Sequence, residues 1–172
     1  PSALARSSDS KINQFLSNGG HIVLVPVANP DGYSMNNSND NLDIMFGPNG
    51  ANHPTVSGLR RVMTGLQKPV RLVYAHCCNE KIYPPMIADP TRALEGALAS
   101  RTQSLVSGIQ QSTTGLQAAT PQERGTIAHQ GALVDDVTTR GDTAAMVSMP
   151  AAARTPNSVE SLMSLVRGMV GS

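Results

Sequence analysis

The order of apolar segments along the first half of the chain predicts a strand, a helix and a second strand. Residues 22–27 form a continuous and mostly β-branched apolar run, which is typical of a strand buried on both faces. Pro54 then opens a segment with apolar residues at helical spacing: Val56, Leu59, Val62, Met63 and Leu66. Residues 70–77 form the second apolar run. This order predicts a βαβ unit and an α/β fold, with a small parallel or mixed sheet and flanking helices.

Further helices are expected on both sides of this unit. Residues 11–18 carry apolar side chains on one face, and the glycine pair at 19–20 provides the left-handed stop that helix ends favour. A helix is also expected over residues 89–100, where an aspartate precedes a proline at the start. Residues 101–120 stay open between helix and strand, because serine, threonine and glycine weaken the helical pattern. Another helix is expected within residues 121–136.

The chain divides into four predicted parts. Residues 1–10 are expected to be a disordered N terminus, and residues 11–137 form one α/β domain. Within that domain residues 28–52 form a long polar loop, and loops of this length are commonly functional or contact other proteins. Residues 138–156, with glycine, proline and an alanine run, are expected to be a linker. An amphipathic C-terminal helix is expected over residues 157–172.

The C-terminal helix has a defined start and one apolar face. Asn157 with Glu160 three residues later is a capping-type start. The apolar face consists of Val159, Leu162, Met163, Val166, Met169 and Val170. This face either folds back onto the domain's own core or, because a linker is expected before it, docks on a neighbouring subunit. In the second interpretation these six residues are the candidate partner interface.

Composition narrows the range of partners. The net charge is only +1 and the lysines and arginines are scattered, which argues against nucleic acid as a main partner. Charged residues make up 15% of the chain, which suits either a domain that folds alone or a subunit lodged among other proteins. No apolar run approaches the roughly 20 residues that span a bilayer. The sequence begins with Pro1, so we expect a processed or truncated form.

No cluster of residues predicts a metal or cofactor site. Cys77 and Cys78 are neighbours on an expected strand, where adjacent side chains point to opposite faces, so a disulfide between them would be strained. His76 beside them lacks the second Cys or His pair that a zinc site needs. We therefore expect two small buried cysteines, no metal and no cofactor.

Four segments stand in an order and at a spacing that carry a family resemblance. They are residues 19–32, Leu59-Arg60-Arg61-Val62, residues 68–75 and Lys81-Ile82-Tyr83-Pro84-Pro85. The series resembles the C-terminal half of the chloroplast-type glycerol-3-phosphate acyltransferase family, and a fainter likeness continues to about residue 137. The resemblance implies an acyltransferase-like α/β domain over residues 11–137 and a plastid setting.

The catalytic motif of that family is missing from this sequence. The family uses His-x-x-x-x-Asp, in which the histidine accepts the proton of the glycerol hydroxyl and the aspartate orients the imidazole. None of the four histidines has an aspartate five residues later, where the chain has Pro26, Gly58, Lys81 and Val134. No arginine or lysine lies between residues 21 and 52, where the family binds the substrate phosphate, although Arg60 and Arg61 remain. We therefore expect no catalytic residue in this chain.

These observations favour a non-catalytic structural or linker subunit on a degenerate acyltransferase scaffold. Packing survives the loss of chemistry because the two use different residues. The expected setting is a larger plastid assembly, for which a photosynthetic membrane complex is a fitting host, with other protein subunits as partners and with peripheral contact to membrane or lipid. Two alternatives stay open. One is the C-terminal part of a glycerol-3-phosphate acyltransferase, which transfers an acyl group from acyl-ACP or acyl-CoA only together with a missing N-terminal half. The other is an unrelated α/β binding domain.

Overall fold

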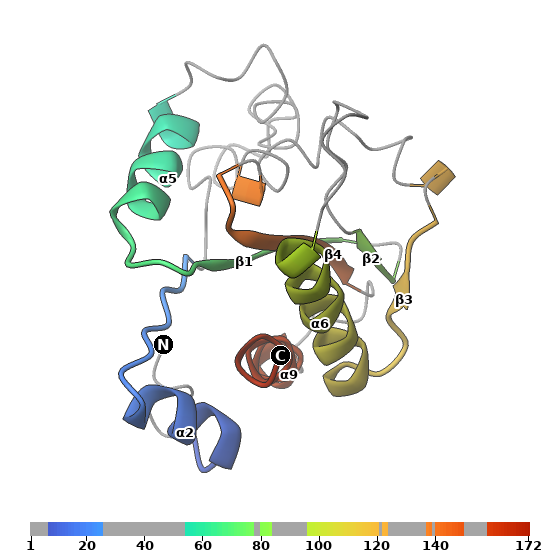
Figure 1. Cartoon of the computed structure of the whole chain (residues 1–172). Helices are drawn as coiled ribbons and strands as arrows, with labels where there is room; N and C mark the ends of the chain where they lie inside the picture. Colours follow the sequence, from blue (N-terminus) through green and yellow to red (C-terminus); the bar gives the residue numbers. More distant parts are fainter. Residues whose placement is uncertain are drawn as a thin grey trace, which may run out of the picture.

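The centre of the fold is a four-stranded mixed sheet (Figure 1). The computed structural model describes residues 7–25, 54–77, 80–83, 96–120, 122–123, 137–138, 140–149 and 158–172. The strands are β1 (Arg71–Cys77), β2 (Lys81–Tyr83), β3 (Gln117–Ala118) and β4 (Thr143–Met149). Their order across the sheet is β1-β4-β2-β3. β4 is parallel to β1 and antiparallel to β2, and β3 is parallel to β2.

Helices lie on both faces of this sheet, as the α/β prediction requires (Figure 1). They are α2 (Ser10–Ser17), α5 (Pro54–Gly65), α6 (Gly96–Ser112) and α9 (Ser158–Val170). The predicted α/β class with a mixed sheet and a C-terminal helix is therefore confirmed, and so are the helix that begins at Pro54 and the early helix that ends before Gly19. Across the described part of the chain, no helix has both the length and the apolar character needed to cross a bilayer.

The βαβ unit is not at the predicted place. β2 and β3 are parallel and are joined through α6, so this segment forms the crossover. The predicted first strand is wrong for residues 22–25, which form no strand and leave Val23 and Val25 exposed by 51% and 48%. Residues 26–27 lie outside the described residues. β1 pairs along its whole length with β4 instead. A β-branched run favours an extended backbone locally, whereas a strand also needs a neighbouring strand to pair with.

The predicted linker over residues 138–156 is wrong at its centre, because residues 143–149 form the buried strand β4. All seven residues of β4 are buried, between β1 and β2. Its sequence holds two alanines and little β-branched character, and it follows a glycine turn at Gly141. Such small residues give a weak strand signal, although they suit a central strand that is covered closely on both faces.

The segment that the sequence left open between helix and strand contains both. α6 continues to Ser112, and residues 117–118 then form β3. The buried side chains of this helix recur at helical spacing: Thr102, Leu105, Val106 and Ile109. Packing against the sheet thus overrides the weak helix propensity of the segment. The predicted helix start at residues 89–95, the polar loop at 28–52 and all of the predicted helix at 121–136 except residues 122–123 lie outside the described residues.

Alternate positions of β1, β2 and β4 supply two hydrophobic clusters, one on each face of the sheet. The first joins α5 to one face and consists of Met63, Tyr83, Val137, Ala144 and Met146, with Leu59, Leu72, Tyr74 and Ala119 packed against it. The second joins α6 and α9 to the opposite face and consists of Ile82, Leu105, Val106, Ile109, Leu116, Ala145, Val147, Met149 and Leu165. β4 and β2 each contribute to both clusters, so these two strands connect the two layers.

α6 and α9 cross at two glycines. A Cβ atom added to Gly108 would lie 2.5 Å from the carbonyl oxygen of Gly168, and one added to Gly168 would lie 2.7 Å from the carbonyl oxygen of Gly108. Both neighbours are backbone atoms, which cannot rotate away as a side chain can. Only glycine at both positions allows the two helices to approach this closely.

We expect Gly168→Ala and Gly108→Ala each to lower the free energy of unfolding by about 1–3 kcal/mol, because the helices must move apart and leave the second cluster poorly packed. The control is Gly58→Ala in α5, where an added Cβ meets no atom within 4 Å. That change is expected to leave stability unchanged or raise it by up to about 1 kcal/mol, through helix propensity. Urea denaturation followed by circular dichroism measures both effects. Equal stabilities for the Gly58 and Gly168 variants would contradict the close crossing.

Candidate interaction surface on the C-terminal helix

α9 lies between α6 on one side and α2 on the other (Figure 1). Leu165 is buried in the second cluster, and Met169 packs against that cluster. Gly168, between them in sequence, lies at the crossing with α6. The C-terminal half of α9 is therefore part of the protein's own core.

The structure divides the six residues of the predicted partner interface between interior and surface. Val166 is buried, and Met163, Met169 and Val170 are half-buried. Val159 and Leu162 are exposed by 51% and 42%. Leu165, which was not in the predicted set, is buried beside Val166. The helix thus uses its C-terminal half for internal packing and keeps two apolar side chains at its N-terminal half in contact with solvent.

Val159 and Leu162 are three residues apart, so they lie on the same side of the helix and form one continuous apolar surface. We call these two side chains the α9 apolar surface. Other large apolar side chains with comparable exposure lie on other elements; they are Leu16, Val23, Val25 and Val62.

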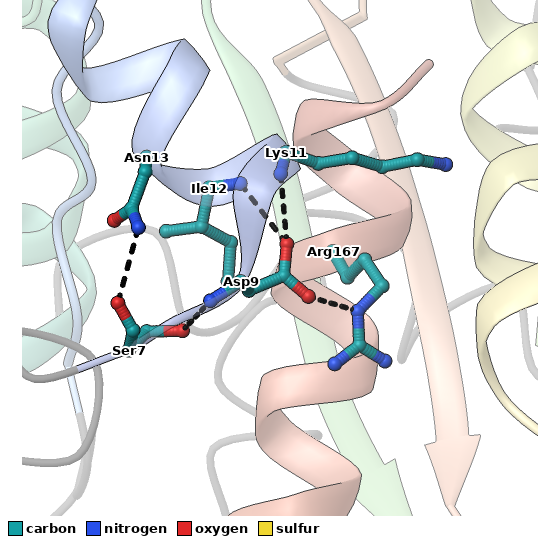
Figure 2. A network of polar contacts seen from close by, with 6 residues as sticks. All are labelled: Ser7, Asp9, Lys11, Ile12, Asn13 and Arg167. Carbon is teal, nitrogen blue, oxygen red and sulfur yellow. Dashed lines mark hydrogen bonds and ion pairs between the residues drawn. The ribbon is translucent and has the colours of Figure 1, made fainter.

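A polar network ties α2 to α9 (Figure 2). One carboxylate oxygen of Asp9 accepts from the backbone N–H groups of Lys11 and Ile12, at 3.0 and 3.2 Å, and so caps the first turn of α2. The other oxygen accepts from Nε of Arg167 in the last turn of α9. Asp9 therefore joins the start of the first described helix to the end of the last one. Asp9 stands within the predicted disordered N terminus of residues 1–10, so neither this cap nor its partner 158 residues away was predicted.

Arg71, the first residue of β1, holds the C-terminal end of α9. Its Nη1 donates to the carbonyl oxygen of Met169 at 2.9 Å, and its Nη2 donates to that of Ser172. The last carbonyls of a helix lack partners within the helix and carry partial negative charge, so a guanidinium both satisfies and stabilises them. With the contact to Asp9 and the crossing at Gly108, this gives α9 three anchors around its C-terminal half.

The residues considered for chemistry come from separate elements within the described part of the chain. His21 is exposed in an irregular segment, and Arg60 and Arg61 lie on α5, the first half-buried and the second exposed. Cys78, His53 and His129 lie outside the described residues, and His76 and Cys77 are in β1. Among the described residues there is also no group of three or more His, Cys, Asp or Glu that could hold a metal ion.

No protein-family profile, curated protein or solved structure matches this chain. The likeness to the plastid acyltransferases therefore stays a prediction.

The Asp9 carboxyl offers a test of the α2–α9 contact. The hydrogen bond from Arg167, followed by the one from the Ile12 N–H, lowers the pKa of Asp9 below its usual value. Because the folded pKa is the lower one, the stabilisation is complete above the unfolded pKa of about 3.9 and is lost as the pH falls through the folded value.

We expect Asp9→Ala to lower the free energy of unfolding at pH 7 by about 1–2 kcal/mol, because both the cap and the ion pair are removed. Asp9→Asn keeps a capping oxygen and should cost less. Urea denaturation at pH 7 and pH 3 measures these costs. The difference between wild type and Asp9→Asn should shrink at pH 3, and a cost that is the same at both pH values would show that the charge of Asp9 has no role.

Proposed function

We propose that this chain is a non-catalytic structural subunit that joins neighbouring proteins in a larger assembly. The observation that carries the proposal is the α9 apolar surface. Val159 and Leu162 are exposed by 51% and 42%, although the same helix buries Leu165 and Val166. Burial of such side chains against a partner is favourable by roughly 25 cal/mol for each Å² of apolar surface.

The position of this surface supports the proposal. The three anchors of α9 all lie in its C-terminal half, at Arg167, Gly168 and Met169. Its N-terminal half is held by continuity with that anchored half, so a partner meets a helix whose direction is already fixed. A preformed surface loses less conformational freedom on binding than a flexible one.

For the setting, we propose a plastid assembly, with contact to a membrane surface as a further element. The series of segments that resembles the plastid acyltransferases supports this proposal. The absence of the His-x-x-x-x-Asp motif from the sequence supports a role in assembly over a role in acyl transfer. A βαβ crossover and its covering helices are compatible with either role, because a fold does not fix a function.

The test replaces the two exposed side chains with charged ones in a tagged full-length chain expressed in its native cells. We expect Val159→Lys with Leu162→Lys to reduce the fraction found in a large complex by about tenfold, since losing roughly 1 kcal/mol at each half-buried position exceeds the 1.4 kcal/mol of a tenfold change. Blue-native electrophoresis and size-exclusion chromatography of the extract measure this fraction.

The matched control is Val62→Lys on α5, a valine exposed by 45% that lies on another element. It should leave the complex intact, and circular dichroism should show the same fold for all three proteins. A wild-type chain that migrates as a monomer in the native extract would contradict the proposal. So would a purified chain that transfers an acyl group from a thioester to glycerol 3-phosphate.

A further inference from the structure

α2 is attached to the rest of the described structure by a small contact. It stands apart from the sheet and packs on α9 (Figure 1). Ile12 is the one residue of this eight-residue helix that is fully buried, and it belongs to neither hydrophobic cluster. The polar part of the contact is the ion pair between Asp9 and Arg167 (Figure 2). Among the described residues, neither cluster contains a member from α2, so both remain complete when α2 is removed.

A helix of this size has little stability of its own. Isolated helices shorter than about 12–15 residues are marginal in water, so α2 depends on α9 to remain folded. Segments with few buried apolar contacts open at a lower free energy than the core does. We therefore expect α2 to leave α9 and unfold without the rest of the domain. α9 would stay in place, because the glycine crossing with α6 and the hydrogen bond from Arg71 to Met169 do not involve α2.

The side of α9 that meets α2 continues to the α9 apolar surface. Arg167 contacts Asp9 on this side. Met163 and Val170 lie four residues before and three residues after Arg167, so they share this side, and both are half-buried. Val159 is four residues before Met163 and is exposed. One side of the helix therefore extends from Val159 to Val170, and the ion pair with α2 lies near its C-terminal end.

α2 is shorter than the helix that it meets. At 1.5 Å per residue, its eight residues span about 12 Å, whereas the 13 residues of α9 span about 20 Å. A longer helix in the same place would also reach the exposed Val159. It would then bury apolar surface that α2 leaves in water, and this burial favours the longer helix over α2.

We propose that α2 is a removable cover, and that the partner of α9 is an amphipathic helix that takes its place. α2 itself defines the chemistry that fits: a carboxylate at the start of the helix for Arg167, and a branched aliphatic side chain three residues later. Release of α2 leaves the guanidinium of Arg167 without its carboxylate, and a second carboxylate is the group that pairs best with it. That the partner is a protein rests on the proposed function. α2 then regulates assembly, because the partner's apparent affinity falls with the fraction of chains in which α2 is released.

Native-state hydrogen exchange of the purified full chain tests the release. After correction for intrinsic rates, the amides of α2 should exchange at least about 100-fold faster than those of α6, because they open without the core. Low urea should leave the exchange of α2 unchanged, since a small opening exposes little surface. Exchange of α2 and α6 at one common rate with the same urea dependence would overturn the proposal, because the two helices would then open as one unit.

Variants of the tagged full-length chain in its native cells test the replacement. The readout is the dilution of the extract at which half of the chain leaves the large complex. Asp9→Ala and Ile12→Ala weaken only the attachment of α2, so each should allow about tenfold greater dilution, in proportion to the larger released fraction. Arg167→Ala should not share this gain, because it loosens α2 and also removes the cation that the partner uses.

The matched control is Gln14→Ala, which changes an exposed side chain of α2 and should leave the complex as in the wild type. Hydrogen exchange of α6 in each variant shows that the core is folded. The proposal is overturned if Asp9→Ala and Ile12→Ala make the complex dissociate at lower dilution, because α2 would then be part of the binding surface. It is also overturned if Arg167→Ala gives the same gain as Asp9→Ala.

These outcomes are distinct from those that test the proposed function. A wild-type chain that is a monomer in the extract removes the assembly role and with it the partner helix. A complex that is weakened when α2 is loosened keeps the assembly role and removes the cover. The exchange experiment needs no partner, so it decides in both cases whether α2 is released.

Discussion

Gly108 and Gly168 allow α6 and α9 to meet at backbone contact, and the other contacts of α9 follow from that approach. With the helices this close, side chains from both reach the same face of β4 and bury it. The end of α9 then lies within reach of Arg71 on β1, and its last turn lies within reach of Asp9 on α2. Two residues without side chains thus position a helix that connects the first described helix to the edge of the sheet.

The sequence predicted the parts of the fold whose signals are local. The start at Pro54 and the glycine stop after α2 were predicted because a proline and a glycine act on their own backbone. The two errors concern pairing. The apolar run at residues 22–25 was taken for a strand, and the alanine-rich residues 143–149 were taken for a linker. Which strand pairs with β1 depends on residues distant in sequence, and no local pattern contains that information.

The apolar face of α9 could be predicted from the sequence, but which of its residues are buried and which are exposed could not. Helical periodicity placed Val159, Leu162 and Val166 on one apolar face, and they do share a helix. Periodicity cannot say which turns of that face are covered, because coverage depends on where α6 ends and α2 begins. In the structure Leu165 and Val166 are buried, whereas Val159 and Leu162 in the first turns are exposed. An apolar face that is continuous in the sequence is therefore packed against the core at its C-terminal end and exposed to solvent at its N-terminal end.

Scattered charges in a near-neutral sequence do not imply a surface without a local field. The net charge is +1, yet the fold brings Lys68 and Arg101 to two consecutive carbonyls, those of Arg140 and Gly141. Two like charges about 10 Å apart repel by roughly 0.4 kcal/mol in water and about 1.7 kcal/mol at the effective dielectric of a protein surface. The buried carboxylate of Asp142, 3.8 Å from Nζ of Lys68, offsets part of that repulsion.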